Sequence, residues 1–136
     1  MDIIDEIKNQ YETGDYFPRS LGIELLELSP GFSKVAITVG PEMVNLHGIG
    51  HGGMIFTLAD TAFGLACNSH GIPAVAMTNT IDYLAPARLG ERLIATGEER
   101  QRSRKTGNYE IKVTSDNGKL VAIVRGIAYF HSTESK

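Results

Sequence analysis

The sequence has 136 residues, of which 42% are hydrophobic and 21% are charged, and this size and composition predict one globular domain over residues 1–136. A formal net charge of −3 is too small to indicate a nucleic-acid or membrane-surface partner, and the single cysteine, Cys67, excludes an intramolecular disulfide or a cysteine-based metal site. Because the N-terminus is acidic and the longest weakly charged stretch is interrupted by glycines, no export signal or membrane span is predicted, and we expect a cytoplasmic protein.

The first third of the chain predicts a short helix followed by two strands. Apolar residues recur at helical spacing between charged ones over about residues 2–13, and Gly14 ends that amphipathic helix. Residues 17–22 are expected to form a connector. Two extended runs follow within residues 23–39 and are separated by a turn at residues 29–31.

The middle of the chain predicts a glycine-rich loop and then a buried helix. Residues 45–53 contain four glycines and two histidines, a composition that favours neither helix nor strand. Residues 54–69 are rich in Met, Ile, Phe, Leu and Ala, and Gly71 is placed as a C-terminal stop. The apolar side chains fall on nearly every side of a helical wheel, which is typical of a helix that is buried all round.

The second half of the chain predicts four strands, at about residues 75–83, 92–100, 108–114 and 120–130. Asn117-Gly118 between the last two strands is a strong signal for a hairpin. The simplest way to bury one helix on most sides is to curl an antiparallel sheet around it and to pack a second copy behind it. We therefore expect an α+β fold in which an antiparallel β-sheet wraps around a central buried α-helix.

Asp60 is the most informative position in the sequence. It is the only Asp, Glu, Lys or Arg between Glu42 and Asp82, and it lies inside the helix that is predicted to be buried. An ionised carboxylate is almost never buried without a partner, because its desolvation is costly. The pattern favours a functional carboxylate over a structural one that faces a polar pocket or pairs across the fold.

The residues just before this helix have a second chemical property. His51, Gly52 and Gly53 stand at the helix start, where backbone N–H groups have no partners within the helix and the helix dipole is positive. Glycines allow an oxygen atom to approach that backbone closely. We expect this turn to polarise a carbonyl and to hold a developing oxyanion, with Asp60 about two helical turns later as the base.

These residues carry a resemblance to a known family. The segment 45–63 (NLHGIGHGGMIFTLADTAF) resembles hotdog thioesterases of the phenylacetate-pathway (PaaI-type) branch, which share an asparagine, His-Gly-Gly and Leu-Ala-Asp at this spacing. Weaker similarity lies in residues 66–69 (ACNS), 80–86 (TIDYLAP) and 121–126, so that the resemblance covers about residues 21–130. It implies the hotdog fold and hydrolysis of acyl-CoA thioesters, with aryl-acetyl (phenylacetyl-CoA-like) substrates favoured.

The resemblance also implies roles for individual residues. Asp60 is expected to be the catalytic carboxylate, either as general base on water or as nucleophile on the thioester carbonyl. Gly52, with Gly53 beside it, presents backbone N–H to that carbonyl, and Asn45 places the water or the thioester. In this family the site lies between two subunits, so Asp60 of one chain would face Asn45 and Gly52 of the other. A homodimer, assembled further into a dimer of dimers (homotetramer), is therefore expected.

Two further positions are candidate substrate contacts. Some relatives have a serine or threonine on the strand after the helix; the nearest hydroxyls here are Thr78 and Thr80, whereas the aligned position is Ala76. His51 either orients the loop, or hydrogen-bonds across the interface, or takes part in catalysis.

Basic residues form another group of candidates. Arg100, Arg102, Arg104 and Lys105 cluster between two strands of an otherwise acidic chain, and Arg88 is an added candidate. Their side chains are suited to the pyrophosphate and 3′-phosphate of coenzyme A, whereas the alternative is a solvated hairpin loop without a ligand. No cofactor or metal is expected, because no second ligand stands at metal spacing from the histidines.

Two other activities are alternatives on this fold. Hotdog hydratases and dehydratases pair a histidine in a different loop with a helix carboxylate, whereas the Gly-Gly after His51 suits a carbonyl. Other hotdog domains only bind acyl-CoA and regulate, usually when fused to a DNA-binding segment, and this chain has no basic recognition helix. Thioester hydrolysis is therefore the predicted function.

Overall fold

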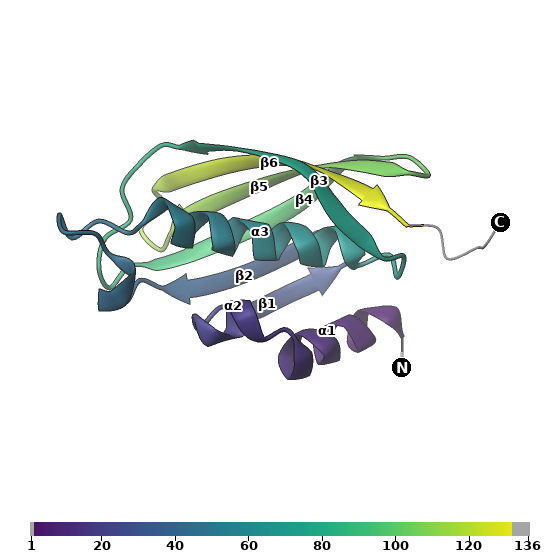
Figure 1. Ribbon diagram of the computed structural model, residues 1–136, viewed down its shortest axis with the longest axis horizontal. Coiled ribbons are helices and arrows are strands. Elements are labelled where there is room, and N and C mark those ends of the chain that lie inside the picture. The colour runs from purple at the N-terminus through teal and green to yellow at the C-terminus, as the bar shows by residue number, and fades with distance from the viewer. Residues whose placement is uncertain (1, 132–136) are drawn as a thin grey trace.

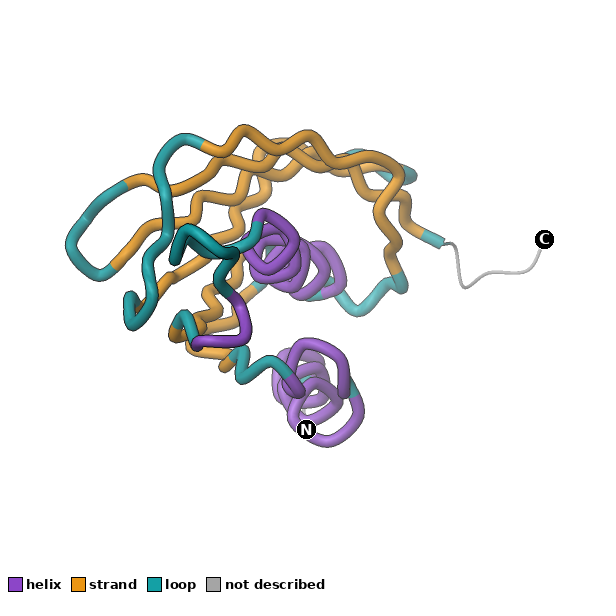
Figure 2. Tube along the Cα trace, turned by 60° about the vertical axis from the view of Figure 1, so that its left-hand side comes forward, coloured by secondary structure: helices purple, strands orange, loops and turns teal. Residues whose placement is uncertain are grey.

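The computed structural model describes residues 2–131. A six-stranded antiparallel sheet curls around one long helix, α3 (Gly52–Asn68), as Figures 1 and 2 show. Two shorter helices, α1 (Ile3–Gly14) and α2 (Tyr16–Ser20), lie on the side of α3 that the sheet leaves open (Figure 2). The predicted α+β architecture, a sheet wrapped around a central helix, is confirmed. The predicted domain limits, residues 1 and 136, lie outside the described residues.

The strands follow the order β1-β2-β4-β5-β6-β3 across the sheet, so β1 and β3 are its two edges. Asn117-Gly118 forms the predicted hairpin between β5 and β6: the side-chain oxygen of Asn117 accepts the N–H of Lys119 at 3.0 Å, and Gly118 has a φ of 87°, which favours glycine. The six strands are β1 (Glu24–Ser29), β2 (Phe32–Thr38), β3 (Ala74–Tyr83), β4 (Arg92–Arg102), β5 (Thr106–Ser115) and β6 (Leu120–Phe130).

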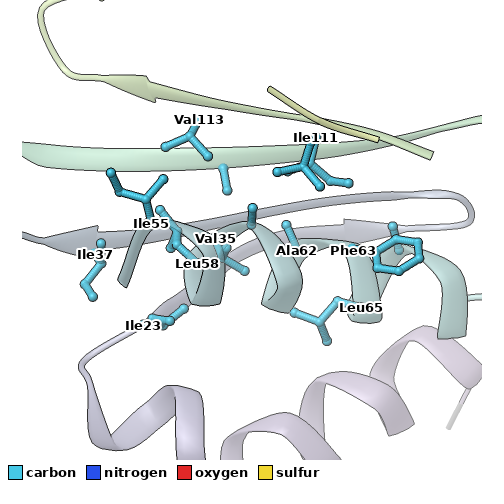
Figure 3. Packing of buried hydrophobic residues seen from close by; sticks show 14 of the residues in the cluster. Ile23, Val35, Ile37, Ile55, Leu58, Ala62, Phe63, Leu65, Ile111 and Val113 are labelled. Atoms are coloured by element: carbon cyan, nitrogen blue, oxygen red, sulfur yellow. The ribbon is translucent and has the colours of Figure 1, made fainter. Parts of the chain in front are cut away.

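The concave face of the sheet packs on α3 and forms the core. The side chains that α3 directs at the sheet are almost fully buried, and Figure 3 labels Ile55, Leu58, Ala62 and Phe63 among them. The ring of Phe63 packs edge-on against Tyr109 of β5, with the ring centroids 5.5 Å apart. Helix and sheet approach so closely that a Cβ at Gly97 would lie 3.1 Å from the carbonyl oxygen of Ala62. This packing holds α3 at one position on the sheet.

The prediction that α3 is buried all round is wrong for one face. Seven residues at three- and four-residue intervals, which we call the open stripe, are exposed or only half-buried: Gly53, Phe56, Thr57, Asp60, Thr61, Gly64 and Asn68. Apart from Asp60, these residues are uncharged, so no stripe of charged residues marks this face on a helical wheel. The sequence pattern therefore did not indicate its exposure. Asp60 is therefore exposed in the single chain, in contrast to the burial expected for it.

The remaining differences from the predicted elements are local. The expected connector at residues 17–22 overlaps α2, whose Pro18 lies in the first helical turn, where proline is tolerated. An unpredicted 3-10 turn, Pro41–Met43, precedes the glycine-rich loop. Among the described residues, no helix is long and apolar enough to cross a membrane.

Candidate active site

The loop before α3 is ordered by one of its own side chains. The side-chain oxygen of Asn45 accepts the N–H groups of His47 at 2.9 Å and Ile49 at 3.1 Å, which is typical of an Asx turn. Gly48, in the same turn, has a φ of 76°, which favours glycine. The Asn45 oxygen thus shapes the loop, while its amide NH2 group donates no hydrogen bond to any of the described residues.

The first turn of α3 presents unpaired N–H groups. Gly52 and Gly53 are its first two residues, and the preceding residue, His51, is exposed and makes no side-chain hydrogen bond to the turn. Between residues 2 and 131, no atom accepts a hydrogen bond from the N–H of Gly52 or Gly53, whereas the N–H groups of Met54 and Ile55 both donate to the carbonyl of His51. Two donors and the positive end of the helix dipole are therefore available to an oxygen atom.

A groove of about 810 Å³ runs between the N-terminal helices and the open stripe of α3. The first wall includes Tyr11 of α1 and Phe17 of α2, and the second includes Phe56 and Asp60 of α3. Phe17 is 66% exposed, so the packing of the single chain does not account for this large apolar side chain. The groove combines a partly aromatic lining with the carboxylate of Asp60, and Asp15 lies at its edge.

The carboxylate of Asp60 has an altered acidity. Desolvation by the groove walls raises the pKa of Asp60 above that of an ordinary aspartate, although the residue is exposed overall. Among the described residues, no lysine, arginine or histidine forms an ion pair with it. An aspartate with a raised pKa is a stronger base once it is ionised, which suits proton transfer from water.

One chain does not bring Asp60 and Gly52 together. They stand eight residues apart on α3, and a helix rises about 1.5 Å per residue, which gives a separation of about 12 Å along the axis. A thioester needs a nucleophile and an oxyanion donor within about 3–3.5 Å of its reacting atoms. The chain therefore holds both halves of the expected site, at positions too far apart to act directly on one thioester group.

Thr78 does not lie in this groove. It is exposed on β3 and lines, with Thr80, a second hollow of about 420 Å³ beside Arg100 and Arg125. The register of β3 against β6 shifts between Ala76, which pairs with Ala128, and Thr78, which pairs with Ile127. Since successive residues of a strand face opposite sides, this shift places Ala76 and Thr78 on opposite faces of the sheet.

The basic candidates lie at two ends of the molecule. Arg88 is exposed and pairs with Ile49 in an isolated bridge, beside the loop that precedes α3. Arg102, the last residue of β4, and Arg104 and Lys105, in the β4–β5 turn, are exposed; Figure 1 shows this turn at the end of the sheet where α3 finishes. Within one chain, only Arg88 of these four is close to the first turn of α3.

Other titratable side chains in or near α3 are paired with neighbouring residues or buried. His70, which follows α3, pairs with Glu99 at 2.7 Å, and the hydroxyl of Tyr109 donates to the same carboxylate at 3.0 Å. Burial raises the pKa of Cys67 to about 12, which keeps its side chain a thiol at neutral pH. Between residues 2 and 131, no group of three or more His, Cys, Asp or Glu side chains is placed to hold a metal ion.

Two features of the site escape sequence reasoning. One is the aromatic lining of the groove, because its members come from three separate helices. The other is Tyr83, the last residue of β3, whose hydroxyl donates to the carbonyl of Gly52 at 3.1 Å. The only sequence signal for Tyr83 is its place in the 80–86 motif, since the two residues are 31 positions apart.

Known proteins are similar to this chain in sequence and in fold. Residues 47–122 match the family model of the thioesterase superfamily. The acyl-coenzyme A thioesterase PaaI of Escherichia coli is 44% identical over 112 residues, which cover 82% of this chain and 80% of that protein. The solved structure of the E. coli PaaI protein has a TM-score of 0.92 at 38% identity and covers 96% of this chain and 94% of that chain.

Two more distant relatives are similar over most of their length. Human acyl-coenzyme A thioesterase 13 is 33% identical over 110 residues, covering 78% of this chain and 79% of that protein. A hypothetical thioesterase from Streptococcus pneumoniae, solved with coenzyme A, has a TM-score of 0.78 at 27% identity and covers 83% of this chain and 88% of that chain. The chain thus belongs to the thioesterase superfamily, and the predictions of a hotdog fold and of a thioester hydrolase are confirmed.

Proposed function

We propose that the chain hydrolyses acyl-CoA thioesters to the free acid and coenzyme A. The observation that carries this proposal is the pairing, on one helix, of a carboxylate with a raised pKa and two N–H donors without acceptors. The names of the relatives support it, since the E. coli and human proteins are acyl-coenzyme A thioesterases and the streptococcal structure holds coenzyme A.

The proposed reaction uses Asp60 and the first turn of α3. The N–H of Gly52, with that of Gly53, polarises the thioester carbonyl and then holds the oxyanion. Asp60 accepts a proton from a water that attacks the carbonyl carbon, or attacks that carbon itself and forms an anhydride that water then hydrolyses. In both routes the C–S bond breaks, the thiolate leaves and takes up a proton, and the acyl group departs as a carboxylate. Asn45 contributes its free amide NH2 group to place the water or the thioester.

The complete site is proposed to form between two chains. The separation of about 12 Å between Asp60 and Gly52 on one helix supports this arrangement, because a second copy would supply the missing half. The edge strand β3 is the proposed contact: an unpaired strand edge is a template for another chain, and its Val75 and Met77 are 52% and 60% exposed. We extend the proposal to a homotetramer made of two such dimers, which light scattering would measure.

The groove favours aryl-acetyl groups as the acyl part of the substrate. Tyr11, Phe17 and Phe56 line it, and aromatic side chains stack well on an aromatic ring. Its volume of about 810 Å³ exceeds what a phenyl ring needs, so the size of the groove alone also admits medium-length acyl chains. Thiol release from phenylacetyl-CoA, compared with that from hexanoyl-CoA, would measure the preference.

The phosphates of coenzyme A are assigned first to Arg88, which lies beside the first turn of α3. Arg102, Arg104 and Lys105 would bind these phosphates only if the partner chain brings its β4–β5 turn to the same site. An Arg88→Ala variant is expected to raise KM for an acyl-CoA and to leave KM for the matching N-acetylcysteamine thioester unchanged, since the latter has no phosphates. Thr78 and His51 remain candidate substrate contacts to be replaced in the same assay.

Replacement of Asp60 is the decisive experiment. Asp60→Asn keeps the shape of the side chain and is expected to remove most of kcat, measured as thiol release with a chromogenic reagent, while the protein stays folded. Asp116→Asn, at an exposed hairpin, is the matched control and should keep wild-type kcat. Equal kcat in the two variants would refute the mechanism. Hydration of crotonyl-CoA without thiol release would support a hydratase instead, and tight acyl-CoA binding without either reaction would support a regulator.

A further inference from the structure

Tyr83 makes a specific contact with the turn that is proposed to hold the oxyanion. It is the last residue of β3, and its hydroxyl donates a hydrogen bond of 3.1 Å to the carbonyl oxygen of Gly52. This side chain is 52% exposed, so burial in the core does not explain its position. The contact joins the end of an edge strand to the start of the central helix.

The backbone around Tyr83 is held on both sides. Tyr83 pairs with Ala122 of β6, and the N–H groups of Leu84 and Ala85 both donate to the carbonyl of Val121. The main chain cannot shift without breaking these hydrogen bonds. The backbone of Tyr83 is therefore fixed at a position from which its side chain contacts the start of α3.

The ring of Tyr83 also lies against position 52. A Cβ at Gly52 would lie 3.1–3.2 Å from three atoms of the Tyr83 side chain, including its hydroxyl oxygen. At Gly53, by contrast, a Cβ would meet nothing within 4 Å. The two adjacent glycines are therefore not equivalent, since a side chain at position 52 would require the Tyr83 ring to give way, whereas one at position 53 would not.

The hydrogen bond acts on the peptide unit that joins Gly52 to Gly53. The carbonyl that receives the Tyr83 hydroxyl belongs to the same planar unit as the N–H of Gly53. A donor on the oxygen fixes the orientation of that unit and polarises it, which strengthens the N–H as a donor on the opposite side.

We propose that Tyr83 is a positioning residue for thioester hydrolysis: it orients the Gly52–Gly53 peptide so that the N–H of Gly53 faces the thioester oxygen. The inference rests on the proposed function, because it assigns that turn to the oxyanion. Tyr83 itself does not touch the reacting atoms in this scheme, and it acts only through the peptide that it holds.

The test compares Tyr83→Phe with Tyr129→Phe. The first variant keeps the ring and removes only the hydroxyl; the second removes a hydroxyl at the far end of β6, where Tyr129 packs edge-on against His131. Tyr83→Phe is expected to lower kcat about three- to tenfold, the effect of one hydrogen bond, with KM within about twofold of wild type. Tyr129→Phe should keep both constants. A kcat for Tyr83→Phe equal to that of the control would overturn the inference.

A second readout separates this inference from the proposed function. In protein labelled with ¹⁵N-glycine, the amide signal of Gly53 should shift in Tyr83→Phe and stay in place in Tyr129→Phe. An unmoved Gly53 signal overturns the positioning role, whatever the activity. Absence of thiol release by the wild-type protein from every acyl-CoA tested would instead overturn the proposed function, and the Gly53 signal would still report whether Tyr83 holds the peptide.

Discussion

Two inactive variants of this chain are expected to restore activity when they assemble together. The first, Asp60→Asn, removes the carboxylate. The second, Gly52→Pro, removes the N–H at the first position of α3, where the helix backbone tolerates proline well, and the exposed Tyr83 ring gives way by a few tenths of an ångström to the added Cβ. The preceding residue, His51, has φ −63° and ψ 141°, the extended conformation that a residue before proline prefers. We therefore expect α3 to persist in both variants.

The recovered activity depends on the distance between Asp60 and Gly52 on one helix and on the number of intact sites in a mixed dimer. Asp60 and Gly52 are separated by about 12 Å of helix, whereas reacting atoms must approach within about 3–3.5 Å, so one chain cannot act directly with both on one thioester. In a mixed dimer, one site joins the intact Asp60 of one chain to the intact Gly52 of the other, and the second site has both defects. Random reassortment of equal amounts makes half of the dimers mixed, which predicts about one quarter of wild-type activity.

The assay is thiol release by mixed dimers that carry a different affinity tag on each chain. Dimers purified through both tags should have about half the activity of wild type per dimer, since one of the two sites is intact. An Asp60→Asn dimer carrying both tags, prepared in the same way, is the control and should stay inactive. Mixed dimers that are no more active than the two parents would show that Asp60 and Gly52 do not act across the interface.

Four other predictions concern Asp60, the groove and the core. Because desolvation raises the pKa of Asp60 and only the ionised form is a base, the acid limb of the kcat/KM profile should lie above the pKa of about 3.9 of an ordinary aspartate. By the same linkage, the cost of ionising Asp60 in the folded chain begins as the pH rises through the unfolded-state pKa and is complete above the folded-state pKa. Asp60→Asn should therefore raise Tm at pH 8 and have little effect below the unfolded-state pKa; an equal change at both pH values would contradict the shift. Phe17→Ala should raise KM for phenylacetyl-CoA several-fold more than KM for acetyl-CoA, and equal changes would place the aryl group elsewhere. Leu58→Ala, at a fully buried position of α3, should lower the free energy of unfolding by about 2–5 kcal/mol in urea titrations, whereas Leu46→Ala, at a residue 92% exposed, should leave it nearly unchanged.

The elements of this fold were predictable because their signals are local. The helical spacing over residues 2–13, the apolar run after Gly53 and the hairpin at Asn117-Gly118 each depend on a few adjacent residues, and each element is present within about two residues of its expected bounds. The α2 helix was missed because its five residues are too few to show a periodic pattern.

The sequence by itself also identified the chemically unusual residues of the central helix. Asp60 was conspicuous as a lone charge, and the glycines were conspicuous at a helix start; both properties can be read without knowing what packs against the helix. What the sequence could not determine is the environment of these residues. The exposure of Asp60 depends on how far the sheet curls around α3, and that curvature results from contacts between strands far apart in the chain.

Only the tertiary structure decided how the parts of the site are related. It placed Asp60 in a groove between α3 and the two N-terminal helices, moved Thr78 to the other face of the sheet through a register shift, and brought Tyr83 to Gly52 across 31 residues. The physical reason is that a helix and a strand each fix their own internal geometry, whereas the packing of one on the other depends on side chains from the whole chain. Local pattern therefore identified the chemistry, and long-range packing determined where that chemistry can take place.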